Sequence, residues 1–239
     1  MASPRKSVRQ PLADRMYEVL LGQFTDGRWS AGQPVNIGAL SRELDVSQTP
    51  LREALARLEH TGLVRREALK GYRVAPLLSE FELIKLMDAR LVLEPALAYE
   101  AARRTTPEFL SEVLESVDDL ARAATSPDTA AFSAYWTIDE RFHLLIAAQA
   151  DNPFLEKAYR SLGGQVQRFR FFAKLGSARG APGLAAEEHR AVYEAMTAGD
   201  ADGAAVRMRE HIQNAKLRVL EDRRAVEGSA SPTLKGADA

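Results

Sequence analysis

The feature that most constrains the fold is a change of pattern at Pro76. The segment before it holds three short stretches with apolar residues at helical spacing, followed by two short extended runs. These elements are expected at residues 12–24, 37–44, 48–60, 63–66 and 72–75. Beyond Pro76 every long stretch has helical periodicity. The break predicts a mainly α protein, in which a small unit with a β-hairpin is joined to an all-α helical bundle.

Capping signals divide the second part into helices. Ser79-Glu80-Phe81-Glu82 has the pattern of a capping box, and three later helices each begin with a capping residue followed by proline. Six helices are expected at residues 79–103, 107–124, 127–149, 153–175, 184–198 and 200–225. The predicted domains are a flexible basic arm (1–10), the small unit (11–76), the bundle (79–225) and a disordered tail (226–239).

Composition excludes several classes of protein. The chain has no cysteine, which rules out disulfides, thiolate metal sites and cysteine nucleophiles. No apolar run approaches the roughly 18 residues that a membrane span needs, and the charged start does not resemble a secretory signal. We therefore expect a cytoplasmic protein without a membrane partner. Residues 1–75 hold 12 Lys/Arg against 8 Asp/Glu, so a basic N-terminal part precedes an acidic remainder.

Three short helices followed by a hairpin predict a winged helix-turn-helix, whose third helix enters the major groove of double-stranded DNA. The exposed face of this helix and the hairpin wing carry polar and basic side chains that suit phosphates and base edges. The candidate DNA-binding residues are Ser47, Gln48, Thr49 and Arg52 on the helix, and Arg65, Arg66, Lys70, Gly71 and Arg73 on the wing. The alternative is that these charges only solvate a surface.

The segment Ser47-Gln-Thr-Pro-Leu-Arg-Glu-Ala-Leu55 closely resembles the signature of the GntR superfamily of bacterial transcription regulators. Arg57-Leu-Glu and Gly62-Leu-Val64 extend the resemblance. Gln48 stands where the family usually has Arg, at a position that contacts DNA in relatives. This departure leaves room for an operator different from the family's common half-site.

Three of the four histidines lie in the bundle: His143, His189 and His211. Asp139 precedes His143 by four residues, so the two share one face of a helix. Three imidazoles and a carboxylate suit a divalent metal ion if the bundle brings their helices together. Each histidine alone is more simply explained as a buried polar residue at a helix seam. We expect the fourth, His60, on the surface.

Residues 79–225 resemble the FCD effector domain of the FadR-type GntR regulators. The resemblance rests on the segments Arg90-Leu-Val-Leu-Glu94-Pro-Ala, Asp139-Glu-Arg-Phe-His143, Glu188-His189-Arg, Gly199-Asp200 and Met208-Arg-Glu-His211. It implies that Asp139 and the three histidines are metal ligands, with Zn²⁺ as the first choice and Ni²⁺ or Mn²⁺ as alternatives. Six expected helices favour the six-helix (VanR-like) division of the family.

The resemblance also implies a small carboxylate as effector. Arg90 matches an arginine that pairs with the anionic end of the ligand in relatives, and Gln165, Arg168 and Asn214 are further candidates. The alternative for Arg90 is a surface ion pair with Glu94, one helical turn away.

The function predicted from these patterns is a metabolite-responsive repressor that binds a palindromic operator as a homodimer. Two alternatives stay open. In the first, the metal ion itself is the signal. In the second, the histidine site belongs to a metalloenzyme, although the chain has no His-Glu-x-x-His motif.

Overall fold

The computed structural model describes residues 11–25, 28–60, 62–76, 78–125, 129–162 and 182–229 of the 239-residue chain. Contacts within the chain divide it into two units, Met1–Pro76 and Leu77–Ala239. The arm expected at residues 1–10 lies outside the described residues.

Leucines at helical spacing build the core of the first unit. Its elements are α1 (Leu12–Thr25), β1 (Pro34–Val35), α2 (Ile37–Glu43), α3 (Gln48–His60), β2 (Val64–Glu67) and β3 (Gly71–Val74). Leu20 of α1 and Leu51, Leu55 and Leu58 of α3 are completely buried, because their spacing places them on the inner faces of the two helices. The predicted winged helix-turn-helix is confirmed.

The wing is one strand larger than expected. β2 and β3 form the predicted antiparallel hairpin, and β1 pairs with the other edge of β3, giving the order β1-β3-β2. Sequence periodicity did not reveal β1, because a two-residue strand that begins with proline has no alternation to detect. At the tip, Leu69 and Gly71 have positive φ angles of 64° and 82°.

The second unit is helical throughout its described part. Its helices are α4 (Glu80–Ala102), α5 (Pro107–Thr125), α6 (Thr129–Gln149), residues 153–162, α8 (Pro182–Thr197) and α9 (Ala201–Ser229). The capping box that opens α4 forms as predicted: Glu82 N donates to Ser79 Oγ at 3.2 Å, and Ser79 N donates to Glu82 Oε2 at 2.8 Å. The mainly α class is confirmed. Residues 163–175 of the expected fourth bundle helix lie outside the described residues.

Two helix boundaries differ from expectation. α8 begins at Pro182 rather than Leu184, since proline is well suited to the first turn of a helix. α9 continues to Ser229, so residues 226–229 are helical and the tail predicted from residue 226 is wrong there. Val226 and Glu227 can continue the helix, and no proline occurs before Pro232. Along the described helices, none has the combined length and apolar character that crossing a bilayer requires.

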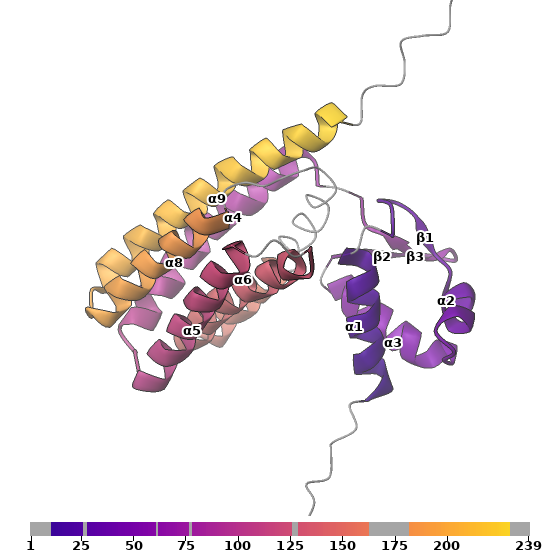
Figure 1. Ribbon diagram of the computed structural model, residues 1–239, viewed down its shortest axis with the longest axis horizontal. Coiled ribbons are helices and arrows are strands. Elements are labelled where there is room, and N and C mark those ends of the chain that lie inside the picture. The colour runs from indigo at the N-terminus through magenta and orange to yellow at the C-terminus, as the bar shows by residue number, and fades with distance from the viewer. Residues whose placement is uncertain are drawn as a thin grey trace, which may run out of the picture. The chain divides into compact units, whose positions relative to one another are not determined.

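The first and last described helices of the bundle pack against each other, with α9 lying along α4 (Figure 1). α8 packs against α5 and α9, and α6 packs against α5 and α4. Polar contacts fasten α9 to the start of α4. They are Lys216 Nζ to Asp88 Oδ1 at 2.5 Å, Arg223 Nε to the Leu78 carbonyl at 3.0 Å, and Arg224 Nη2 to Glu80 Oε1 at 2.7 Å.

Candidate nucleic-acid interface and candidate metal centre

The predicted reading residues of α3 all lie at the surface. Ser47, Gln48, Thr49 and Arg52 are exposed, whereas the apolar side of the same helix is buried. Arg52 Nη2 donates a hydrogen bond to Gln48 Oε1 at 3.3 Å. The two side chains that suit guanine and adenine therefore lie together on the outer face of the helix.

The basic side chains of the wing fall into two groups. Arg65 and Arg73 each contact Glu67 at 2.9 Å, and Arg73 also donates to the Gly32 carbonyl at 3.0 Å. Arg73 thus ties the hairpin to the segment before β1. Arg66 and Lys70 are exposed, and within the described ranges neither side chain forms an ion pair.

The structure brings the four predicted metal ligands together in the second unit. α6 supplies Asp139 and His143, α8 supplies His189, and α9 supplies His211; each is at most 2% exposed. His189 Nε2 lies 3.3 Å from His211 Nε2 and 3.6 Å from Asp139 Oδ1. His143 Nε2 lies 3.9 Å from Asp139 Oδ2. One ring nitrogen of each histidine is within 4.8 Å of the others.

Carboxylates hold two of the rings from behind. His143 Nδ1 lies 2.7 Å from Glu94 Oε2, and His211 Nδ1 lies 2.7 Å from Glu188 Oε2. The ring of His189 stacks on Phe142, with centroids 3.8 Å apart and planes 9° from parallel. The Nε2 atoms of His143 and His211 therefore face the common centre, because a carboxylate lies 2.7 Å from each Nδ1 atom on the other side of the ring.

The carboxylate behind His143 is itself part of a buried ion pair. Arg90 contacts Glu94 through both Nε and Nη2, and both side chains are 2% exposed. Burial alone would raise the pKa of Glu94, but the Arg90 guanidinium and His143 lower it to about 2. Glu94 is therefore an anion that keeps a fixed place behind the histidine.

Glu188, the carboxylate behind His211, is held by three side chains. Arg218 donates to both its oxygens at 2.9 and 2.7 Å, and Asn214 Nδ2 donates to Oε1 at 2.9 Å. Partial burial would raise the pKa of Glu188, but Arg218 and His211 lower it to about 2. Burial lowers the pKa of His211 in spite of Glu188, so its ring is neutral near pH 7 and has a lone pair free for a metal.

These residues fit a divalent ion on an observation independent of any family. His143 Nε2 is buried and, among the described residues, makes no hydrogen bond. A buried polar atom without a partner is costly in a folded protein. Three imidazole nitrogens and one carboxylate oxygen are a donor set for Zn²⁺, Ni²⁺ or a similar ion.

The candidate effector residues have different positions. Arg90 forms the i,i+4 pair with Glu94 that its spacing predicts, but the pair is buried, so the surface alternative is wrong in its location. Asn214 is exposed and contacts Glu188. Gln165 and Arg168 lie outside the described residues. The side chain of His60 also lies outside the described part.

Sequence reasoning missed three polar side chains of this centre. The sequence predicts Glu94 only as a surface partner of Arg90, contains Glu188 only as part of the segment Glu188-His189-Arg, and gives Arg218 no role. A partial signal existed for Glu188, which directly precedes His189. Arg218 lies seven residues after His211, two turns along the same helix face, and this spacing could have identified it.

A winged helix-turn-helix with a polar outer face on its third helix, joined to a helical domain, is the architecture of a DNA-binding regulator. Residues 12–74 match the bacterial regulatory proteins of the gntR family, and residues 85–214 match the FCD domain. The chain belongs to the GntR family of transcription regulators and carries an FCD domain.

The similarity to curated relatives covers most of this chain and most of each relative. The chain is 28% identical over 211 residues to a probable D-xylose utilization operon transcriptional repressor of Paenarthrobacter nicotinovorans, covering 88% of this chain and 90% of the relative. It is 30% identical over 190 residues to the Nta operon transcriptional regulator of Aminobacter aminovorans, covering 80% and 86%.

Solved structures share the whole fold. E. coli McbR/YncC matches with a TM-score of 0.73 at 20% identity, covering 90% of this chain and 99% of that structure. A GntR regulator from Rhodococcus sp. RHA1 matches with a TM-score of 0.70 at 21% identity, covering 89% and 99%. The curated relatives are named as transcription regulators, and the protein is a transcription regulator rather than an enzyme.

Proposed function

We propose that the protein is a metal-assisted, effector-responsive repressor that binds a palindromic operator in the cytoplasm as a homodimer. The observation that carries the metal part is the inward orientation of His143 and His211, fixed by Glu94 and Glu188 at 2.7 Å. If these histidines were purely structural, their Nε2 atoms would have no reason to point at one common buried centre.

Asp139, His143, His189 and His211 would hold the ion, which when bound supplies a Lewis acid that attracts a carboxylate. Zn²⁺ is the preferred ion on its affinity for imidazole, with Ni²⁺ and Mn²⁺ as alternatives. The protein's own part is to orient the rings. Glu188, anchored by Arg218 and Asn214, does this for His211, while burial keeps that ring neutral.

Elemental analysis of the purified protein tests the metal site. We expect about one equivalent of divalent ion per chain, lost when His143→Ala is combined with His189→Ala. His60→Ala is the matched control, because it removes the remaining histidine, which lies on α3. An ion content that stays the same in the double variant contradicts the site.

The effector in this proposal is a small organic acid bound beside the histidine centre. α4 carries Arg90, while α6, α8 and α9 carry the histidines, so a ligand held among them favours one arrangement of these helices. A ligand shifts an equilibrium only through its different affinity for the two states, typically about 1–3 kcal/mol of coupling. We expect the cognate acid to change operator affinity by about five- to a hundredfold.

A second candidate function has a specific observation in its favour. Arg90 already contacts Glu94 through two nitrogens in a buried pair, so it has less capacity to bind an added carboxylate. A regulator in which the metal ion itself is the signal needs no such capacity. The structure therefore supports a metal sensor as the alternative to a metabolite sensor.

Operator binding measured in a two-way titration separates the two functions. Metal-depleted protein is titrated with Zn²⁺ alone and then with a panel of small hydroxy- and keto-acids. A response to the acids only in Zn²⁺-loaded protein supports the metabolite sensor, and a full response to Zn²⁺ alone supports the metal sensor. Arg90→Lys tests the anchor, because lysine keeps the charge but loses the bidentate fork. An acid response in Arg90→Lys equal to that of the wild type contradicts the role of Arg90.

The homodimer and the palindromic operator follow from the size of the reading helix. One recognition helix contacts only a few base pairs, so specific binding needs two half-sites related by a twofold axis. Light scattering with and without operator DNA tests this proposal. A monomer under both conditions contradicts it.

A further inference from the structure

The outer face of the wing carries two arginines directly opposite each other. The register of the hairpin pairs Arg65 of β2 with Arg73 of β3. Glu67 follows Arg65 by two residues on β2, so the pleat of the strand places it on the same face. The other face of the hairpin holds Val64, Tyr72 and Val74, which are buried. Like charges at opposite positions of a sheet repel, so this register favours a counter-ion between the two arginines.

Glu67 is that counter-ion. Arg65 Nη2 donates to Glu67 Oε1 at 2.9 Å, and Arg73 Nε donates to Glu67 Oε2 at 2.9 Å, so each carboxylate oxygen accepts from a different arginine. Burial raises the pKa of Glu67, but Arg73, Arg65 and Lys70 together hold it below its ordinary value of 4.5. The side chain is therefore an anion at neutral pH, and it lies between two cations.

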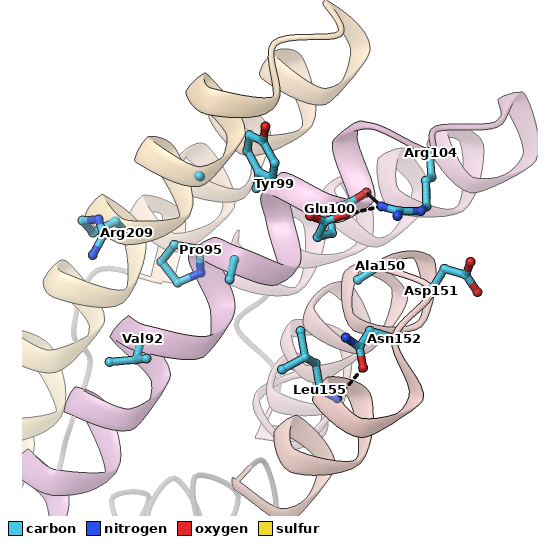
Figure 2. Close-up of a pocket in the computed structure, with 12 residues that line it drawn as sticks. Val92, Pro95, Tyr99, Glu100, Arg104, Ala150, Asp151, Asn152, Leu155 and Arg209 are labelled. Atoms are coloured by element: carbon cyan, nitrogen blue, oxygen red, sulfur yellow. Dashed lines mark hydrogen bonds and ion pairs between the residues drawn. The ribbon is translucent and has the colours of Figure 1, made fainter.

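The bridge made by Glu67 is not a result of helical spacing. Figure 2 shows the more ordinary case on α4, where Glu100 and Arg104 pair one helical turn apart beside a surface pocket. Glu67 instead joins two strands, because Arg73 comes from the other arm of the hairpin. One carboxylate thus occupies donors of two arginines on the surface of the DNA-binding unit.

This carboxylate opposes the attraction between the wing and DNA. A cation that meets a phosphate releases counter-ions and adds about one unit to the slope of log affinity against log salt. Non-specific binding consists almost entirely of such contacts, whatever the base sequence. A carboxylate bonded to an arginine competes with the phosphate for that arginine and also repels the phosphate.

We propose that Glu67 is a specificity-determining residue, which keeps Arg65 and Arg73 from phosphates and so weakens binding to DNA outside the operator. The inference rests on the proposed operator binding and adds a means of rejecting other sequences. In an operator complex the base contacts of α3 fix the position of the wing, so a released arginine gains a phosphate only where one is within reach. A non-specific complex can slide along the DNA until the arginine meets one. The effect of Glu67 is therefore larger on non-specific DNA.

Glu67→Gln tests the proposal in the full-length protein, because glutamine keeps the size and the hydrogen-bonding oxygen but not the charge. The operator probe is a duplex selected from a random library by the wild-type protein, and the non-specific probe is the same duplex in scrambled order. Fluorescence anisotropy at several salt concentrations measures both affinities.

We expect Glu67→Gln to bind the scrambled duplex about five- to tenfold more tightly near 0.1 M salt, with a slope steeper by about 1. One unit rather than two is expected, because Arg73 also donates to the Gly32 carbonyl at 3.0 Å and stays held. The affinity for the selected duplex should rise by a smaller factor.

Two further variants keep the result interpretable. Glu43→Gln is the matched control, because it removes the same charge from the same unit at a residue that lies 4.0 Å from Arg28 on another surface segment. It should raise the scrambled-duplex affinity much less. Arg65→Gln alone should leave the slope nearly unchanged, since Glu67 already occupies this arginine. In the Glu67→Gln protein the same change should reverse the gain, because it removes the released cation.

Each outcome supports or overturns the proposal. A lower melting temperature of Glu67→Gln without tighter binding to the scrambled duplex would show that Glu67 only stabilises the hairpin. Equal gains on both duplexes would show that it does not determine specificity. A full slope unit lost in Arg65→Gln alone overturns the proposal even where Glu67→Gln fails to fold, because Arg65 then already contacts a phosphate. A wild-type protein that selects no duplex contradicts operator binding itself, which is a different result from these three.

Discussion

The two units of the protein place their functional polar groups in opposite environments. The winged helix-turn-helix keeps Arg52, Arg66 and Lys70 exposed to water. The helical domain buries Arg90, Glu94 and its histidines almost completely. Removing one partner of an exposed polar pair lowers the free energy of unfolding only slightly, because water replaces the lost contact. Removing one partner of a buried pair lowers it much more, because the remaining charge stays out of water without a partner. Function and stability are therefore separable in the first unit and coupled in the second.

The largest expected effect is the loss of stability when the buried pair of Arg90 and Glu94 is broken. Glu94→Leu leaves the Arg90 guanidinium buried without its partner and should cost about 3–5 kcal/mol of unfolding free energy. Combining it with Arg90→Met should cost clearly less, because two apolar side chains replace two charges. Urea unfolding of both variants measures the difference. Equal losses in the single and double variants would show that the pair is not an energetic unit.

Removing a base-reading side chain should change function without changing stability. Arg52→Ala is expected to weaken operator binding by about 1–3 kcal/mol, which corresponds to roughly 5- to 150-fold. Among the residues that the structure describes, its side chain bonds only to Gln48 at the surface, so the melting temperature should stay unchanged. Fluorescence anisotropy and thermal unfolding on the same sample compare the two. A large fall in melting temperature would contradict the separation of function from stability in this unit.

The pH dependence of stability should come from the helical domain. The pKa values of Glu94 and Glu188 lie near 2 in the folded protein, below the ordinary value of 4.5. The unfolded chain binds protons first as the pH falls, so this stabilisation is complete above about pH 4.5 and is lost toward pH 2. Glu188→Gln should flatten the acid limb of the stability curve, and the effect should be smaller than that of breaking the buried pair, because Glu188 is partly exposed. An unchanged acid limb would contradict the lowered pKa.

The smallest expected effects concern the salt dependence of DNA binding, and they distinguish Arg66 and Lys70 from Arg73. Arg66→Ala and Lys70→Ala should each reduce the slope of log affinity against log salt by about 1, since each removes one phosphate contact. Arg73→Ala should change the slope less and the stability of the wing more, because Arg73 is held by Glu67 and the Gly32 carbonyl. Binding titrations at several salt concentrations measure the slopes. A full unit lost in Arg73→Ala would place that side chain on DNA.

The sequence predicts the polar surface of the winged helix-turn-helix better than the buried centre of the helical domain, for a physical reason. A DNA-reading surface is local: the polar face of α3 and the hairpin are contiguous in sequence, and their spacing predicts which side chains face outward. The histidine centre depends on how three helices pack. Periodicity places Asp139 and His143 on one face but gives no sign that Glu94 or Glu188 stands behind the rings.

The strand β1 and the two groups of wing cations were missed for related reasons. A strand that starts at Pro34 has too few residues to show alternation. The division between Arg73 and Arg66 depends on which one lies beside Glu67 across the hairpin, and this follows from the register of β2 and β3. Composition counts both as basic residues and cannot separate them.

The contacts of α9 with the start of α4 also govern how the protein is made. Lys216, Arg223 and Arg224 fasten a segment that is synthesised about 130 to 145 residues after its partners. The winged unit is held by contacts within its own 76 residues, so it can fold while the ribosome is still translating the helical domain. The helical domain has to wait for α9, because its first helix lacks its main packing surface until then. A chain released before α9 would therefore carry a folded winged helix-turn-helix beside an unfinished helical domain.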